Sequence, residues 1–167
     1  GFDAVDAVTT VAAAYPNQKF LFVDGTITGC DNVTSVSFRD NEKTFLLGMV
    51  AAMKTEAQHL GVVAAMNVDS INMFVTGFIA GAEYVNPDIT VDVKYVGSFS
   101  DTTTAKEMAI SMHEAGADII ATFAGGSGLG VFTAAAEDSF LAIGCDTNQC
   151  LIDPSCIMLS GIRKIDV

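Results

Sequence analysis

Hydrophobic and polar positions along this chain follow two periods, one typical of helices and one typical of strands. Apolar residues at helical spacing predict helices over residues 3–15, 42–54, 70–85, 101–114 and from the glycines near 125 to about 137. Short apolar or alternating runs predict strands over 19–24, 33–38, 59–65, 90–96, 119–122, 141–144 and 157–160. Strands that alternate with helices in this way favour an α/β fold, with a parallel sheet covered by helices on both faces.

A glycine cluster marks the clearest candidate for a binding loop. The apolar run before it ends near Phe123, Gly125 to Gly128 follow, and an alanine-rich helical pattern then begins. Ligands of open α/β sheets bind beyond the carboxyl ends of the strands, where the amides of helix N-termini are free. The spacing excludes a dinucleotide fingerprint, because the third position after Gly128 is Val131. The alternative is that the glycines only form a tight turn.

Composition narrows the class of protein. Of 167 residues, 50% are hydrophobic and 17% are charged, which is enough apolar material for a sizeable core and excludes disorder. The 20 acidic residues against 8 basic ones give a net charge of −12, which argues against a nucleic-acid partner. No apolar run approaches the length of about 18 residues that a membrane span needs.

The cysteines leave two readings open. A disulfide between Cys150 and Cys156 would close a small loop around Pro154, and buried free thiols are the alternative, for these two as for Cys30 and Cys145. Metal binding is disfavoured because no C-x-x-C is present and both histidines are distant from the cysteines in sequence. No nucleophile and base are placed together by any motif, so the sequence predicts neither a catalytic set nor a cofactor.

Acidic and aromatic residues at predicted strand ends are the candidates for ligand binding. Asp24 and Asp146 stand where a carboxylate can accept hydrogen bonds from two neighbouring hydroxyls, with a turn or a helix cap as the alternative role. Asp101 is expected to cap the helix that follows it. Phe99 comes after a glycine and a serine at a strand end, where it is either a platform for a flat ring or a packing residue of the loop.

Several sequence blocks in one order extend over nearly the whole chain. They include Phe20-x-x-x-Asp24-Gly25, Phe74-x-x-Gly77-Phe78-x-Ala80-Gly81-Ala82, Tyr95-Val96-Gly97-Ser98-Phe99-x-Asp101, Ala124-Gly125-Gly126-x-Gly128-x-Gly130-Val131 and Ile143-Gly144-x-Asp146-x-x-Gln149. In this order the blocks resemble the basic membrane protein family, the purine nucleoside receptor-like branch of the type I periplasmic binding protein fold.

The resemblance implies a fold and a function together. It implies a non-enzymatic, two-lobed, extracytoplasmic receptor, often a lipoprotein, that delivers a purine nucleoside to the permease of an ABC-type importer. Each lobe would be a doubly wound parallel sheet. From the resemblance we expect residues 1–60 to belong to lobe 1, residues 61–153 to lobe 2, and residues 154–167 to cross back toward lobe 1. The composition changes near Gly61 and Pro154 mark candidate crossings between the lobes.

The resemblance also implies a set of site residues. Phe99 would stack on the base, with backbone and polar contacts near Gly125 and Gly126. Asp146 would bind the ribose hydroxyls together with a basic residue of the last segment, either Arg163 or Lys164. Asn67 is a further member of the set, and Asp24 is a weaker one.

Departures from the family's pattern keep a second function open. Ala64-Ala65-Met66-Asn67 stands where the family often has Gly-Gly-Met-Asp, and Arg163 stands where a lysine is usual. The family's opening and final portions have no counterpart here, so we expect a partial chain. The alternative function is a structural or assembly module with a degenerate cleft, inside the cell, whose incomplete lobe is covered by a protein partner.

Overall fold

The protein is described here by a computed structural model that places residues 4–164; the outermost positions of the first predicted helix and of the last predicted segment lie outside the described residues. The chain divides into two compact units, Gly1–Arg39 and Asp40–Val167. This boundary falls one helix before the lobe boundary expected after residue 60, because helix α2 (Asp40–Lys54) packs against helix α3 (Asp69–Val85) of the second unit. The assignment of the units to lobes stays a prediction.

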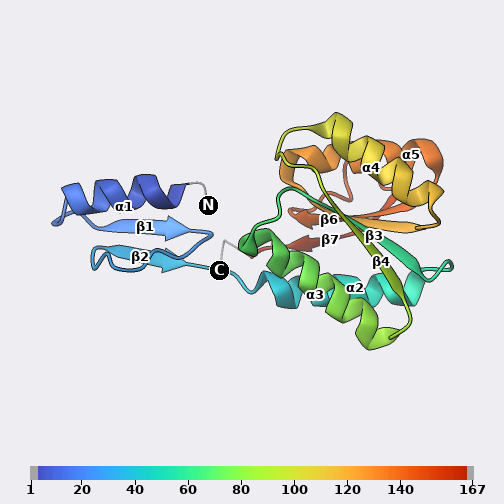
Figure 1. The fold of residues 1–167 in the computed structure, drawn as a ribbon, viewed down its shortest axis with the longest axis horizontal. Helices are drawn as coiled ribbons and strands as arrows, with labels where there is room; N and C mark the ends of the chain where they lie inside the picture. Colours follow the sequence, from blue (N-terminus) through green and yellow to red (C-terminus); the bar gives the residue numbers. More distant parts are fainter. Residues whose placement is uncertain (1–3, 165–167) are drawn as a thin grey trace. The chain divides into compact units, whose positions relative to one another are not determined.

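The first unit consists of helix α1 (Val5–Ala14) and two parallel strands, β1 (Phe20–Val23) and β2 (Val33–Val36) (Figure 1). Alternation along β1 buries Phe22 and leaves Leu21 67% exposed on the opposite face. The side-chain amide of Asn32 donates hydrogen bonds to the carbonyls of Ala12, Tyr15 and Gln18, at 3.0, 3.1 and 3.0 Å respectively. These bonds tie the end of α1 to the loop before β1 and to the start of β2.

The second unit is built on a five-stranded parallel sheet in the order β4-β3-β5-β6-β7. Its strands are β3 (His59–Ala64), β4 (Thr90–Tyr95), β5 (Ile119–Phe123), β6 (Leu141–Asp146) and β7 (Ile157–Ile162). The strand order reverses between β3 and its two neighbours, which makes this a doubly wound sheet with a topological switch point beside β3. The predicted α/β class and parallel pairing are confirmed.

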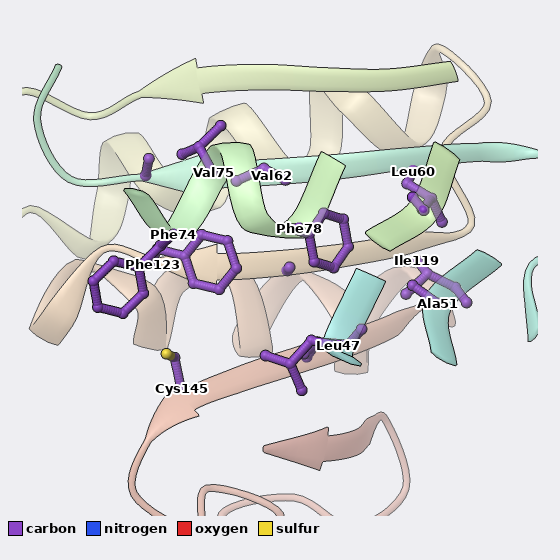
Figure 2. Packing of buried hydrophobic residues seen from close by; sticks show 14 of the residues in the cluster. Leu47, Ala51, Leu60, Val62, Phe74, Val75, Phe78, Ile119, Phe123 and Cys145 are labelled. Carbon is purple, nitrogen blue, oxygen red and sulfur yellow. The ribbon is translucent and has the colours of Figure 1, made fainter. Parts of the chain in front are cut away.

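Helices cover both faces of this sheet (Figure 1). Helices α2 and α3 lie on one face, and α4 (Thr102–Glu114) and α5 (Leu129–Asp138) lie on the other, with the short 3-10 helix η2 (Gly125–Gly128) leading into α5. Figure 2 shows the core under α2 and α3, where Phe74, Phe78 and Phe123 meet. Burying one such ring stabilises the fold by roughly 1.5–3 kcal/mol, so this cluster holds the helices firmly to the sheet. None of the helices in residues 4–164 has the length and apolar character that crossing a membrane requires.

Several elements are longer in the structure than the apolar pattern predicts. Strand β6 runs on to Asp146 and β7 to Ile162, and α2 begins at Asp40 rather than at residue 42. The apolar pattern stops short of the ends of α2 and β6 because α2 begins at Asp40 and β6 ends at Asp146, which are charged. The predicted N-cap is confirmed: the Asp101 carboxylate accepts hydrogen bonds from the backbone N–H and the hydroxyl of Thr104, at 3.0 and 2.6 Å.

Candidate functional site

The carboxyl ends of the five parallel strands of the second unit lie at one edge of the sheet, which we call the carboxyl edge. All the predicted site residues of this unit follow or end these strands and are therefore brought to this edge: Asn67 after β3, Phe99 after β4, Gly125 and Gly126 after β5, Asp146 at the end of β6, and Arg163 and Lys164 after β7. Asp24 belongs to the first unit, where it follows β1 with a φ of 67° and is half-buried.

Phe99 and the glycine loop approach each other closely. A Cβ atom added at Gly125 would lie 3.2 Å from Cδ1 of Phe99, and one added at Gly126 would lie 3.0 Å from the Phe99 carbonyl oxygen. Gly125 also has a φ of 57°, a conformation that side-chain-bearing residues rarely adopt. The ring of Phe99 is half-buried. The glycines therefore let the loop after β5 pass directly beside this aromatic side chain.

Ser127 fastens the loop that carries Phe99 to the glycine loop. Its side chain is fully buried, and its hydroxyl donates to the Ser98 carbonyl at 2.9 Å and accepts from the Asp101 N–H at 2.9 Å. Its backbone N–H donates to the Phe99 carbonyl at 3.0 Å. Because Ser98, Phe99 and Asp101 are all hydrogen-bonded to Ser127, the backbone around Phe99 is fixed in position.

Asp146 stands beside two cations. The Lys43 ammonium lies 2.8 Å from its Oδ1 atom, and Nε of Arg163 lies 3.4 Å from the same atom. The side chain of Asp146 is nevertheless 48% exposed, so a ligand has access to it. Asp146 is the last residue of β6 and has a φ of 71°, so the extended backbone of the strand ends there.

Asp40 lies beneath this arrangement and holds both cations. Nε and Nη2 of Arg163 donate to its two oxygens at 2.9 and 2.6 Å, and Lys43 Nζ lies 2.9 Å from Oδ1. Burial opposes ionisation of Asp40, but the hydrogen bonds from Arg163 and Lys43 outweigh it and hold the pKa of this carboxyl below its ordinary value. Both cations also lie over the ring of Phe74, at 4.8 Å for Lys43 Nζ and 5.4 Å for Arg163 Cζ.

The remaining predicted residues differ in how they are supported. The side chain of Asn67 is held by Asn72, whose amide nitrogen donates to its oxygen at 2.8 Å, and Asn72 in turn accepts a hydrogen bond from the Tyr95 hydroxyl at 2.8 Å. Lys164 is exposed. The structure thus gathers Phe99 with Gly125 and Asp146 with Arg163 in direct contact, whereas Asn67 and Lys164 share the same edge of the sheet only through the positions of their strands.

Sequence reasoning missed Lys43, Asp40 and Ser127. Lys43 and Asp146 are 103 residues apart, so no local pattern connects them. The spacing of Asp40 and Lys43 on one helix face was a usable signal, since an i,i+3 pair can bind one further charged group together. Ser127 lies within the glycine cluster, and the pattern of that cluster pointed to the glycines and not to the serine.

The four cysteines are free thiols. Burial, with the negative charge of Asp146 as the second cause, raises the pKa of Cys145 to about 12, so this thiol stays protonated and unreactive at neutral pH. Within residues 4–164, no cluster of three or more histidine, cysteine or acidic side chains could hold a metal ion.

A separate hollow of about 520 Å³ lies between α2 and α3. Its lining includes Phe45, Leu46 and Ala80, and none of the predicted site residues contributes to it.

The carboxyl edge presents a different kind of surface. It combines a half-buried aromatic ring with a partly exposed carboxylate flanked by two cations, which suits a ligand that carries both a flat ring and hydroxyl groups.

Comparison with known proteins shows that the chain is similar to substrate-binding proteins of ABC transporters. The family model described as "Bmp: ABC transporter substrate-binding protein PnrA-like" matches residues 1–167. The ABC transporter nucleoside-binding protein BmpA of Lactococcus lactis subsp. cremoris is 39% identical over 157 residues, covering 89% of this chain and 45% of that protein. Basic membrane protein D of Borreliella burgdorferi is 36% identical over 138 residues, covering 81% of this chain and 40% of its own length.

The fold is also shared with a solved binding protein. The crystal structure of an ABC transporter system solute-binding protein from Aeropyrum pernix K1 matches with a TM-score of 0.92 at 30% identity, covering 99% of this chain and 50% of that one. The chain thus spans about half the length of the proteins it matches, or somewhat less. The predicted periplasmic-binding-protein-like fold, as a partial chain, is confirmed.

Proposed function

The chain belongs to the Bmp family of PnrA-like ABC transporter substrate-binding proteins, and from this premise we propose that it takes part in binding a purine nucleoside for an ABC-type importer. The family is one of binding proteins and not of enzymes, as the sequence predicted. The name of the relative from Lactococcus lactis, a nucleoside-binding protein, supports the class of ligand.

One observation carries the proposal. The carboxyl edge presents Phe99, held beside Gly125, and Asp146, held beside Arg163, on the same side of one sheet. A purine ring stacks on the aromatic side chain, where such a pair contributes about 0.5–1.5 kcal/mol beyond the burial of area. The ribose hydroxyls donate to the Asp146 carboxylate, and the Arg163 guanidinium donates to their oxygens.

The other predicted residues complete the proposed site. Gly126 and Asn67 provide backbone and amide groups for the polar edge of the base, and Lys164 extends the basic side of the ribose site. Asp24, which follows β1 in the first unit, stays a weaker candidate of its own. By the character of the family, the protein works outside the cytoplasm and passes its ligand to the permease of the importer.

The test is calorimetric titration of the full-length protein with guanosine, adenosine and inosine, in the wild type and in two variants. Asp146→Ala should weaken binding by about 1.5–3 kcal/mol, roughly ten- to hundredfold, the loss expected of a charge-assisted hydrogen bond. Phe99→Ala should weaken it as well, and the two changes together should abolish measurable heat. Asp138→Ala, at the exposed end of α5, is the matched control and should bind like the wild type.

Unchanged affinity in Asp146→Ala would remove the role assigned to this carboxylate. A folded wild-type protein that gives no heat with any nucleoside would favour the other candidate, a module that keeps the fold for assembly. In that case, the exposed apolar face of the β1–β2 sheet, with Leu21 67% and Val23 41% exposed, is the surface that a partner would cover.

A further inference from the structure

All the protein contacts described for the Asp146 carboxylate fall on one of its two oxygens. Within residues 4–164, Lys43 Nζ at 2.8 Å, Arg163 Nε at 3.4 Å and Cys145 Sγ at 3.4 Å all approach Oδ1. None of these donors is paired with Oδ2. A carboxylate held at one oxygen has a fixed rotamer, so its second oxygen points in a defined direction.

Lys43 makes the shortest of these contacts and is itself held on two other sides. Its side chain is 13% exposed, Asp40 Oδ1 lies 2.9 Å from Nζ, and the ring of Phe74 lies 4.8 Å below. Asp40 is in turn 5% exposed and forms a bidentate pair with Arg163. Fixing a lysine side chain ordinarily costs much conformational entropy. The side chain of Lys43 is already held by its place on α2 and by Asp40.

From this geometry we propose that Lys43 is a positioning and specificity residue of the site. This role rests on the proposed function. Lys43 holds Oδ1 of Asp146, so that only Oδ2 contacts the ligand. A single oxygen can accept from both ribose hydroxyls only when they are adjacent and on the same side of the ring. Lys43 therefore makes the site select a cis-diol, and so a ribonucleoside over its 2′-deoxy counterpart.

The experiment measures the ratio of the dissociation constants for guanosine and 2′-deoxyguanosine, using the full-length protein. Lys43→Met removes the charge but keeps an unbranched stem over Phe74, and Lys43→Arg restores a cation. The control is Lys106→Met, which breaks an exposed ion pair with Glu137 in the other helical layer. The Tm of each variant confirms that it is folded.

In the wild type and in Lys106→Met, guanosine should bind more tightly than 2′-deoxyguanosine. In Lys43→Met, the affinity for guanosine should fall by about tenfold, the effect of losing one charge-assisted contact, while that for 2′-deoxyguanosine changes little. The discrimination should return in Lys43→Arg. A lysine that merely stabilised the fold would weaken both ligands equally and leave the ratio unchanged.

Each contrary outcome is distinct. If the wild type discriminates and Lys43→Met discriminates equally well, the role of Lys43 is wrong and the proposed function stands. If the wild type binds both nucleosides with one affinity, the selection of a cis-diol is wrong. If the wild type binds neither, the proposed function fails, and with it the role of Lys43.

Discussion

At the scale of single residues, Asp40 links the stability of the second unit to its candidate site. The side chain of Asp40 is 5% exposed and accepts hydrogen bonds from the guanidinium of Arg163, while the Lys43 ammonium lies beside it. A buried carboxylate is tolerated only when it is paired in this way. The same pairs set the positions of both cations beside Asp146, so the residue acts on the site without being exposed to a ligand.

The pKa of Asp40 gives a prediction about pH. Because the folded-state pKa is lowered, the ionised carboxylate stabilises the folded protein in full above the unfolded pKa of about 3.9, and this contribution is lost as the pH falls toward the lower folded value. Asp40→Asn should lower the free energy of unfolding by roughly 3 kcal/mol at neutral pH. The difference from the wild type should shrink as the pH falls from about 5 to about 2.

Denaturant unfolding of both proteins across this range measures the difference directly. Asp138→Asn, an exposed aspartate at the end of α5, should show no such dependence. A difference between Asp40→Asn and the wild type that stays constant as the carboxyl titrates would contradict the ionic role of Asp40.

At the scale of elements, the close packing of α2 against α3 depends on glycines. A Cβ atom added at Gly81 would lie 1.9 Å from the Phe45 carbonyl oxygen, and one added at Gly48 would lie 2.0 Å from the Phe78 carbonyl oxygen. The two helix backbones therefore touch, and Leu47 and Phe78 are buried against the sheet beneath them. This contact places the first turn of α2, with Asp40 and Lys43, beside the end of β6.

Gly81→Ala tests this packing, because the two physical effects of the substitution change the stability of the protein in opposite directions. Helix propensity alone predicts that alanine stabilises a helix interior by about 1 kcal/mol relative to glycine. The backbone contact predicts the opposite, a loss of about 1–3 kcal/mol, because an extra methyl group forces the helices apart. Thermal unfolding of the full-length protein distinguishes the two, and a raised Tm would show that α2 and α3 are not in backbone contact.

The helices and strands themselves were largely predictable from the sequence. The period of the hydrophobic residues, and the glycines and prolines that mark turns, are local properties of the chain. Residues 119–122, for instance, form a short apolar run before a glycine cluster, and they lie within β5. The ends of α2 and β6 were not predictable from the apolar pattern, because the charged residues Asp40 and Asp146 extend those elements. Their ionic partners lie in other elements, so only the folded chain shows why charged residues stand there.

At the scale of the whole molecule, the order of strands decides where a ligand site can form. The chain order β3 to β7 becomes β4-β3-β5-β6-β7 in the sheet, with the switch point beside β3. The loops after β4 and β5, which carry Phe99 and Gly125, lie on either side of the end of β3. Sequence reasoning predicted these residues because strand ends can be read locally, and the resemblance supplied the roles of Asp146 and Arg163.

The compact units of the chain meet at Arg39 and Asp40. The division into lobes, which came from the family resemblance, stays a prediction. Helix α2 is amphipathic like its neighbours, so its apolar face does not reveal which sheet it covers. That information comes from its contacts with α3 and β7.

The most direct test of the account is hydrogen exchange of the full-length protein with and without saturating guanosine. With guanosine bound, exchange should be slower in the loops at the carboxyl edge, residues 97–101 and 124–128, and after Asp146 at the end of β6. Residues 55–58 and 115–118, which precede β3 and β5 at the opposite edge, should be unchanged. No change anywhere, or protection confined to the opposite edge, would contradict the claim that the carboxyl edge binds a nucleoside.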